Sequence, residues 1–315
     1  MSHNVDTWRP VGFDEYIGQA AVKEELRVHI AAAIAQDRPL PHIFLYGPPG
    51  AGKTSLAKVL EDETGDEMHA EVCPIDLRVL TDLVTSHEGI LFLDEIHNLK
   101  RSVQEAMLPL LEFGHIKHGR FTVKSGWLTI VAGTTERQAV IKPLRDRFPI
   151  KPRFAAYTDE EMNRICLSMA VKAGLELDAA TCSGIARAAG GVPRTIRNIL
   201  TAADALQASE GSMPSLDQIL GLLGIDSDGL TPDERHYLFG LRDLGGVAGL
   251  DTLSNFLHDS PATLRETERT LVRKGMIVFT SRGRELTSMG HRRIRGPEVS
   301  GRRRLERTAP VRGVG

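Results

Sequence analysis

Cysteine pairs, long apolar runs and a large excess of one charge are all missing from this sequence, and each absence excludes a class of protein. The three cysteines, Cys73, Cys166 and Cys182, lie far apart and form no Cys-x-x-Cys pair. We therefore predict buried thiols in a reducing compartment, not a disulfide scaffold or a zinc site. No stretch approaches the ~20 apolar residues that a membrane helix needs, and residues 1–10 lack the apolar core of a signal peptide. A cytoplasmic protein without membrane contact is expected.

The net charge is close to zero, but it is unevenly distributed. The 315 residues include 39 Lys and Arg against 41 Asp and Glu, a formal charge of −2. The 41% hydrophobic and 25% charged fractions are typical of globular proteins, and the length corresponds to two or three domains. Residues 272–315 hold 12 basic and 3 acidic side chains, so this end carries +9 and residues 1–271 carry −11. The basic end is the part of the chain best suited to DNA.

The first half of the chain alternates helical and strand-like patterns. Apolar residues at helical spacing predict a helix over residues 14–36, and a second helix is expected from Lys53 to about residue 62. Short apolar runs at residues 42–46, 89–93 and 127–132 predict strands that are buried on both faces. Strands that alternate with helices are typical of an α/β domain with a parallel sheet.

After residue 155 the pattern is mainly helical. Thr158 and Glu161 match a capping box that begins a helix to about residue 172. Further helices are expected over 178–189 and 193–208, before a loop at 209–215.

The next elements are predicted helices at 231–243, 250–258 and 261–274, a strand at 276–279, a turn at 281–284 and a return strand from Leu286. This order is that of a winged helix. From about residue 291 the chain is Arg-rich without apolar periodicity, and we predict a disordered tail.

A phosphate-binding motif follows the first predicted strand. Residues 47–54 read Gly-Pro-Pro-Gly-Ala-Gly-Lys-Thr and match G-x-x-x-x-G-K-[ST], with a strand before and a helix after. Gly50 and Gly52 allow the backbone to approach phosphate, and the loop amides form an anion site. Lys53 supplies a charge for the β- and γ-phosphates, and Thr54 offers a hydroxyl to Mg²⁺. The motif predicts nucleotide binding.

Other polar residues occupy positions that suit hydrolysis. Asp94 and Glu95 follow a buried strand, where Asp94 could hold Mg²⁺ and Glu95 could polarise the attacking water. Thr135 follows the next predicted strand. Arg147, in Leu-Arg-Asp-Arg-Phe, is either part of a solvated ion pair or an arginine finger for a neighbouring subunit. Arg194 begins a predicted helix after Gly-Gly-Val-Pro. It is either a residue of the functional site or a simple surface charge.

The order of these motifs resembles that of the AAA+ ATPases, and the finer resemblance is to the RuvB family, bacterial motors of Holliday-junction branch migration. It covers about residues 8–290. It is carried by residues 9–19 (Arg-Pro, then Phe-Asp-Glu-Tyr-Ile-Gly-Gln), 45–50, 93–97, 143–148, 157–158, 191–194, 247–253 and 281–284. The resemblance implies an α/β fold: an AAA+ P-loop parallel-sheet domain at 1–154, a helical lid at 155–225, a winged helix at 226–290 and a basic tail at 291–315.

The resemblance also implies roles for individual residues. ATP and Mg²⁺ would be the cofactors. The predicted nucleotide-binding residues are Trp8, Arg9, Tyr16, Ile17, Gly50, Gly52, Lys53, Thr54, Ser55, Tyr157 and Arg194, with Thr54 and Asp94 at the metal. The predicted catalytic residues are Lys53, Asp94, Glu95, Thr135 as first sensor, Arg147 as the finger in trans, and Arg194 as lid sensor. Arg282 and Arg284 of the wing would contact DNA.

Four departures from the family suggest a divergent member, such as one carried by a phage or mobile element. The segment between Lys53 and Asp94 is short. So is the stretch 114–126, which is basic where the family docks its partner RuvA. The resemblance implies a possible RuvA-like partner, and this short basic stretch puts that partner in doubt. Phe279 stands where a second DNA-contacting arginine is expected, and the Arg-rich tail has no counterpart.

Two functions fit these motifs. The leading hypothesis is a homo-hexameric, ATP-driven DNA translocase of the branch-migration type, which acts on a Holliday junction or another branched or duplex DNA. The alternative is an AAA+ loader or regulator that is tethered through its winged helix and does not translocate.

Overall fold

The computed structural model describes residues 8–119 and 121–294. The chain forms two compact units, Met1–Pro232 and Asp233–Gly315, and each is described by itself. Among the described residues, every helix is too short or too polar to cross a membrane.

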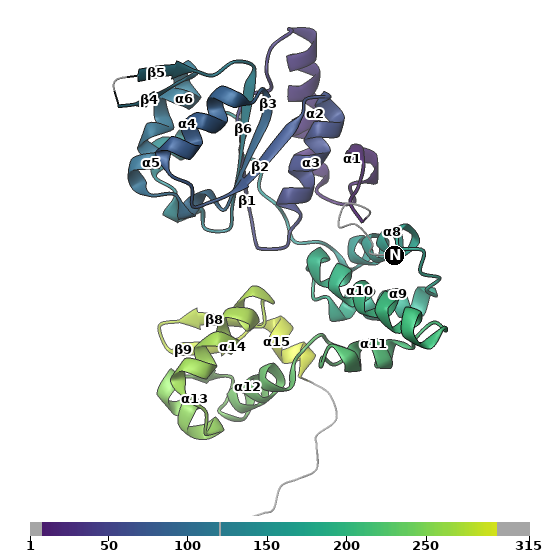
Figure 1. Ribbon diagram of the computed structural model, residues 1–315. Helices are drawn as coiled ribbons and strands as arrows, with labels where there is room; N and C mark the ends of the chain where they lie inside the picture. Colours follow the sequence, from purple (N-terminus) through teal and green to yellow (C-terminus); the bar gives the residue numbers. More distant parts are fainter. Residues whose placement is uncertain (1–7, 120, 295–315) are drawn as a thin grey trace, which may run out of the picture. The chain divides into compact units, whose positions relative to one another are not determined.

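The first unit is built on a four-stranded parallel sheet (Figure 1). Its strands are β1 (Ile43–Tyr46), β2 (Met68–Val72), β3 (Gly89–Asp94) and β6 (Leu128–Thr134), in the order β1-β6-β3-β2. The predicted parallel α/β fold is confirmed. Strand β2 escaped prediction because it is an edge strand: of its five residues only Met68 is buried, so it lacks the apolar run of its neighbours.

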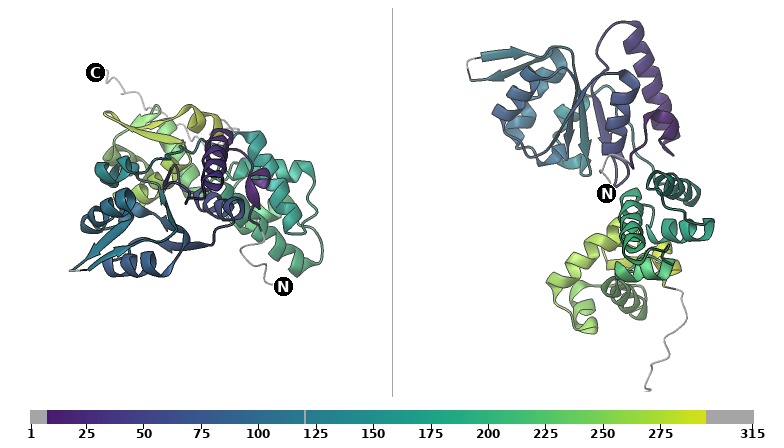
Figure 2. Two further views of the ribbon diagram at one scale, coloured as in Figure 1. Left: turned by 90° about the horizontal axis from the view of Figure 1, so that it is seen from above. Right: turned by 45° about the vertical axis from the view of Figure 1, so that its right-hand side comes forward.

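Helices cover both faces of the sheet (Figure 2). Successive side chains of a strand point to opposite faces, so Ile43 and Leu45 join one core while Phe44, between them, joins the other. The first core is covered by α1 (Gly12–Glu15), α2 (Ala20–Ala35) and α3 (Lys53–Thr64). The second is covered by α4 (Leu77–Ser86), η1 (Ile96–Asn98), α5 (Arg101–Ala106), α6 (Leu108–Phe113) and α7 (Lys142–Asp146). The short η2 (Arg137–Ala139) contributes no buried residue.

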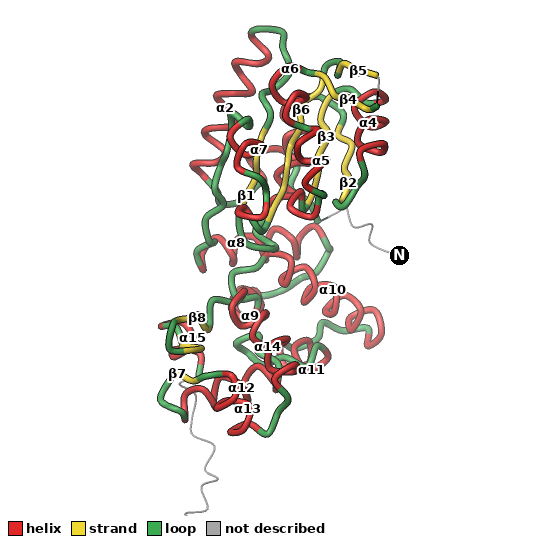
Figure 3. The backbone as a smooth tube through the Cα atoms, turned by 90° about the vertical axis from the view of Figure 1, so that its left-hand side faces the viewer, coloured by secondary structure: helices red, strands yellow, loops and turns green. Residues whose placement is uncertain are grey.

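The parallel arrangement brings the carboxyl ends of the strands to one edge (Figure 3). Tyr46 of β1 lies in register with Thr134 of β6, and β6 in turn pairs with β3. The residues that follow β1, β3 and β6 therefore meet, and ligands of α/β sheets bind at this edge.

The predicted single helix over residues 14–36 is wrong, because the chain breaks between α1 and α2. Gly18 and Gln19 have left-handed φ angles of 78° and 50°, which a helix cannot contain. The side chain of Gln19 donates to the carbonyl of Ala155 and accepts from its amide, both at 2.9 Å. These long-range bonds override the local helical pattern, and the break carries Tyr16 and Ile17 to the nucleotide site.

Residues after 155 form a helical bundle of α8 (Asp159–Lys172), α9 (Ala179–Ala188), α10 (Pro193–Glu210) and α11 (Leu216–Leu222). The predicted capping box is present, with Thr158 Oγ1 accepting from the Glu161 amide at 3.1 Å and Glu161 Oε2 from the Thr158 amide at 2.8 Å. Helix α10 continues through Glu210, so the connecting loop begins two residues later than predicted. Trp8, from the opposite end of the unit's sequence, packs into the core of this lid.

The second unit has the helix–helix–helix–hairpin order of a winged helix, as predicted. Its elements are α12 (Pro232–Asp243), β7 (Val247–Ala248), α13 (Leu250–Leu257), α14 (Pro261–Arg273), β8 (Ile277–Thr280), β9 (Gly283–Leu286) and α15 (Ser288–Arg293). The antiparallel sheet has the order β7-β9-β8. Strand β9 begins inside the predicted turn at 281–284. Helix α15 includes residues 291–293 and is followed by the buried Ile294, where the sequence predicted disorder; residues 295–315 of the predicted tail lie outside the described residues.

A hairpin of β4 (His115–His118) and β5 (Phe121–Lys124) projects from the helices beside the sheet (Figures 1 and 2). Its inner residue Ile116 is buried in the second core, which anchors its base. Lys117 is exposed, and Phe113, at the end of α6, stacks on His115 with 5.8 Å between ring centroids.

Candidate nucleotide-binding and hydrolysis site

The phosphate loop connects β1 to α3 and is held in close contact with its surroundings. Gly50 and Gly52 have left-handed φ angles of 76° and 94°. A Cβ on Gly50 would lie 2.5 Å from Val192, and one on Gly52 would lie 2.5 Å from the Tyr16 hydroxyl. Only glycine fits at both positions, because the lid and the N-terminal segment approach the loop backbone directly.

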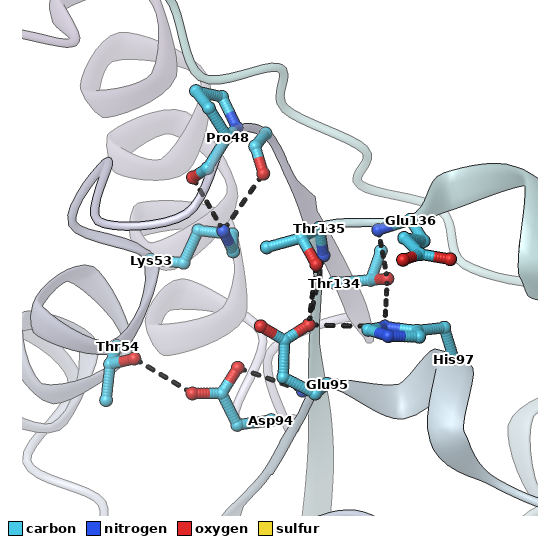
Figure 4. Close-up of polar contacts among 10 residues, drawn as sticks. Pro48, Lys53, Thr54, Asp94, Glu95, His97, Thr134, Thr135 and Glu136 are labelled. Carbon is cyan, nitrogen blue, oxygen red and sulfur yellow. Dashed lines mark hydrogen bonds and ion pairs between the residues drawn. The ribbon is translucent and has the colours of Figure 1, made fainter. Parts of the chain in front are cut away.

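Lys53 is the first residue of α3, and only 6% of it is exposed. Its Nζ donates to the carbonyls of Gly47 and Pro48, both at 3.0 Å (Figure 4). Burial lowers the pKa of Lys53, and the nearby Glu95 and Asp94 carboxylates oppose this effect. A buried ammonium at the start of a helix is placed to bind a phosphate, which would compensate its charge.

Thr54 and Asp94 fit a Mg²⁺ ion. Thr54 Oγ1 donates to Asp94 Oδ2 at 3.0 Å across the space between α3 and the end of β3 (Figure 4). Within the described residues there is no group of three or more His, Cys, Asp or Glu side chains that could hold a metal alone. One hydroxyl and one carboxylate suit Mg²⁺, because this ion keeps several waters and takes further oxygens from substrate phosphates.

Glu95 is held by a network at the ends of β3 and β6. It adopts a left-handed backbone conformation, with φ 50° and ψ 46°, directly after the strand. Its Oε2 accepts from both the amide and the hydroxyl of Thr135 at 3.1 Å, and lies 3.2 Å from His97 Nδ1 (Figure 4). His97 Nδ1 is also 3.1 Å from the hydroxyl of the buried Thr134. These contacts leave Oε1 as the carboxylate oxygen that can face a water.

Sequence reasoning assigned no role to His97. It follows Glu95 by two residues in Asp-Glu-Ile-His, and the 3-10 helix η1 turns its ring back onto the carboxylate. A histidine two residues after a predicted catalytic carboxylate was the available signal. Thr135 contacts Glu95 and is not among the residues that line the cavity.

Two adjoining cavities at this edge match a nucleotide. The larger, about 230 Å³, is lined by the phosphate loop, Asp94, Glu95 and the lid residues Pro193, Arg194 and Arg197. The smaller, about 60 Å³, is lined mainly by apolar and aromatic residues that include Trp8, Tyr16, Ile17, Tyr157 and Met169. Both cavities share Gly52, Ser55, Met169 and Pro193. A polar cavity beside an apolar one suits phosphates and a base.

The two tyrosines of the smaller cavity are tied to the phosphate loop. Tyr16 donates to the carbonyl of Gly52 at 3.2 Å and Tyr157 to that of Ala51 at 3.0 Å. Burial raises the pKa of Tyr16 well above its ordinary value and also raises the pKa of Tyr157, so both stay neutral donors. Arg9 lines neither cavity; its carbonyl accepts from Lys172 Nζ at 2.6 Å.

The structure places the two candidate arginines of hydrolysis differently. Arg194 lines the same cavity as Lys53 and Glu95. Arg147 lies at the end of α7, outside that cavity, where Nε donates to Glu112 Oε2 at 2.8 Å and Nη1 to the carbonyl of Pro143 at 3.0 Å. Arg147 therefore forms an ion pair within its own subunit, which was one of the two interpretations of the sequence. Its role as an arginine finger for a neighbouring subunit stays a prediction.

The two wing arginines also differ. The side chain of Arg282, in the β8–β9 turn, is 73% exposed and lies 3.5 Å from Glu285 Oε2. Arg284, in β9, is only 19% exposed and donates to Glu268 of α14. The structure does not test DNA contact by either residue.

The parallel sheet, the phosphate loop with its acid pair, and the lid arginine facing the same cavity define a P-loop ATPase of the AAA+ class. Family models match two regions: the P-loop domain of the Holliday junction DNA helicase RuvB over residues 8–154, and the RuvB C-terminal winged helix domain over residues 227–295.

Known proteins agree with these matches. The RuvB subunit of the Holliday junction branch migration complex from Prochlorococcus marinus is 36% identical over 90% of this chain and 85% of its own length. The subunit from Anaeromyxobacter sp. is 35% identical over 88% and 86%. The Thermotoga maritima RuvB Holliday junction branch migration motor superposes with a TM-score of 0.74 at 29% identity, over 91% of this chain and 98% of its own. The chain belongs to the RuvB family, and its P-loop domain binds nucleotide.

Proposed function

We propose that this protein is an ATP-driven motor that moves DNA at branched junctions, and that it works as a homo-hexameric ring. The observation that carries the proposal is the position of its catalytic groups: Lys53, Glu95 and Arg194 share one cavity, while Arg147 lies outside it. The cavity holds the predicted catalytic groups except the arginine finger. A neighbouring subunit completes the site when it supplies Arg147. Family membership and the winged helix support DNA as the partner.

The geometry gives each residue a task. Lys53 binds the β- and γ-phosphates from the phosphate loop. Thr54 and Asp94 would hold Mg²⁺, which neutralises phosphate charge when it is bound. Glu95 orients the attacking water through Oε1, because Thr135 and His97 fix its other oxygen.

Arg194 links hydrolysis to movement. It lies at the start of α10 in the lid and faces the phosphate end of the cavity. Loss of the γ-phosphate removes a partner of Arg194, so the lid shifts relative to the sheet. The hexamer converts these shifts into translocation of DNA.

The test is strand movement on a synthetic four-way junction, measured beside ATP hydrolysis. We expect hydrolysis to rise when junction DNA is added, and the junction arms to exchange only with ATP. Active hydrolysis without stimulation and without exchange would instead support a loader or regulator. The assay is run with and without a RuvA, because the resemblance places RuvA docking at the β4–β5 hairpin, and this hairpin carries the exposed Lys117 and the Phe113–His115 stack.

His97 should control turnover and not nucleotide affinity. In His97→Ala, Glu95 loses the 3.2 Å contact with Nδ1 that helps to fix Oε2, and a misplacement of about 1 Å can cost about 10²-fold in rate. We expect kcat to fall roughly 10- to 100-fold on this basis, with KM little changed. The matched control is His69→Ala on β2, whose ring pairs with Glu71. An unchanged kcat in His97→Ala, or an equal loss in the control, would refute this role.

A further inference from the structure

The lid carries a second arginine at the phosphate cavity, to which no sequence motif assigns a role. Arg197 lies three residues after Arg194 on α10, and both residues line the cavity of about 230 Å³ together with Lys53. Side chains three residues apart share one face of a helix, and both are inclined toward its N-terminus. Helix α10 begins at Pro193, which lines the same cavity. Arg197 therefore extends back toward the phosphate loop.

The cavity has an excess of positive charge. Its lining residues include three cations, Lys53, Arg194 and Arg197, and two acids, Asp94 and Glu95. Both acids already accept hydrogen bonds from threonines of the sheet domain. A polyphosphate compensates such an excess, because it carries several negative charges and many acceptor oxygens.

Arg197 is half-buried and has no partner among the described residues. Its guanidinium donates no hydrogen bond and forms no ion pair in this part of the chain. By contrast, Arg147 and Arg101 each pair with a glutamate. A half-buried guanidinium without an acceptor loses part of its hydration and gains no hydrogen bond in exchange. A phosphate in the same cavity would supply acceptors in a geometry that suits the planar guanidinium.

Arg194 lies beside the phosphate loop and close to Lys53. A Cβ on Gly50 would lie 3.7 Å from Arg194 Cβ. Burial lowers the pKa of Lys53, and the Arg194 guanidinium lowers it further, so these two cations are near each other. Arg197 begins about 4.5 Å further along the helix axis, since each helical residue rises about 1.5 Å. The two arginines therefore reach different parts of a bound phosphate chain.

We propose that Arg197 is a nucleotide-binding residue that contacts the phosphates common to ADP and ATP, whereas Arg194 contacts the γ-phosphate. Both arginines belong to one helix, so loss of the γ-phosphate releases Arg194 while Arg197 keeps the lid attached to the nucleotide. The lid then pivots about Arg197 and does not open completely. The pivot rests on the proposed motor function, while the contact itself requires only that the site binds nucleotide.

Equilibrium titration of the full chain with fluorescent ADP and a fluorescent, non-hydrolysable ATP analogue tests this assignment. Arg197→Gln removes the charge and should weaken the binding of both nucleotides roughly 10- to 100-fold, because hydrogen bonds between charged groups are among the stronger ones. Arg197→Lys keeps the charge and should bind both nucleotides more tightly than Arg197→Gln does. Arg187→Gln is the matched control, since Arg187 is an exposed lid arginine on α9 that lines neither cavity.

Unchanged affinities in Arg197→Gln, or a loss that the control shares, would overturn the inference. A loss confined to the ATP analogue would also contradict it, since Arg197 would then be a second contact to the γ-phosphate.

Thermal unfolding tests for a merely structural role. Arg197→Gln should keep the wild-type Tm without nucleotide, because Arg197 has no partner to lose among the described residues. Saturating ADP should then raise the Tm of the variant less than that of the wild type. A lower Tm without nucleotide would assign Arg197 to lid packing. None of these measurements uses DNA, so a chain that binds nucleotide but exchanges no junction arms would contradict the proposed function and leave this test intact.

Discussion

Replacing Glu95 with glutamine should reduce ATP turnover by at least about 100-fold while ATP still binds, because positioned acid–base groups contribute about 10²–10⁴-fold. The amide keeps the shape of the side chain, so the cavity walls formed by the phosphate loop and the lid remain. It cannot accept a proton from the attacking water. The side chain can still accept from Thr135, so the local structure should persist.

Steady-state hydrolysis and the affinity for a fluorescent ATP analogue measure the two parts of this prediction. Glu136→Gln is the matched control, since it makes the same chemical change on an exposed neighbour outside the cavity. Wild-type turnover in Glu95→Gln would mean that another group activates the water. Loss of analogue binding would mean that Glu95 supports the nucleotide site and not the chemistry.

Replacing Arg147 with alanine should reduce kcat by about 10³-fold or more, the range measured for arginine fingers. The substitution should leave the subunit folded. The Arg147 and Glu112 side chains are 32% and 44% exposed, and exposed ion pairs contribute at most about 1 kcal/mol. The reduction would therefore report the lost stabilisation of the γ-phosphate and not unfolding. Arg101→Ala, which also breaks an exposed ion pair, is the control.

Mixing two inactive variants tests whether the finger acts in trans. A subunit with Arg147→Ala retains its own Glu95, and a subunit with Glu95→Gln retains Arg147. In mixed rings some cavities combine an intact Glu95 with a neighbour's Arg147, so the mixture should hydrolyse ATP faster than either variant alone. A mixture no more active than its components would show that Arg147 serves its own cavity or none.

The elements that could be predicted are those whose information is local. The phosphate loop and its acid pair are contiguous motifs, and the strands that precede them are short apolar runs with burial on both faces. The capping box of α8 is complete within four residues. The capping box forms locally because its hydrogen bonds close within four residues. The strands pair with distant partners, but their burial on both faces leaves an apolar run that the sequence shows directly.

The elements that escaped prediction depend on distant partners. Strand β2 exists because β3 pairs with it, and the break between α1 and α2 exists because Gln19 bonds to Ala155. No local pattern contained either contact. In both cases a tertiary hydrogen bond outweighed a weak local preference, which is the usual limit of propensity.

For the candidate site the same division holds. The P-loop motif predicted a nucleotide-binding site, because a charge and a hydroxyl after a glycine-rich turn already specify that chemistry. The order of the motifs, through its resemblance to a known family, predicted the AAA+ class. Only the folded chain showed that His97 and Thr135 hold one oxygen of Glu95, and that Arg284 is paired with Glu268 while Arg282 is exposed. Arg282 and Arg284 lie two residues apart, and the sequence alone does not distinguish them. Only the structure shows that Arg284 is partly buried beside the Glu268 carboxylate while Arg282 is exposed.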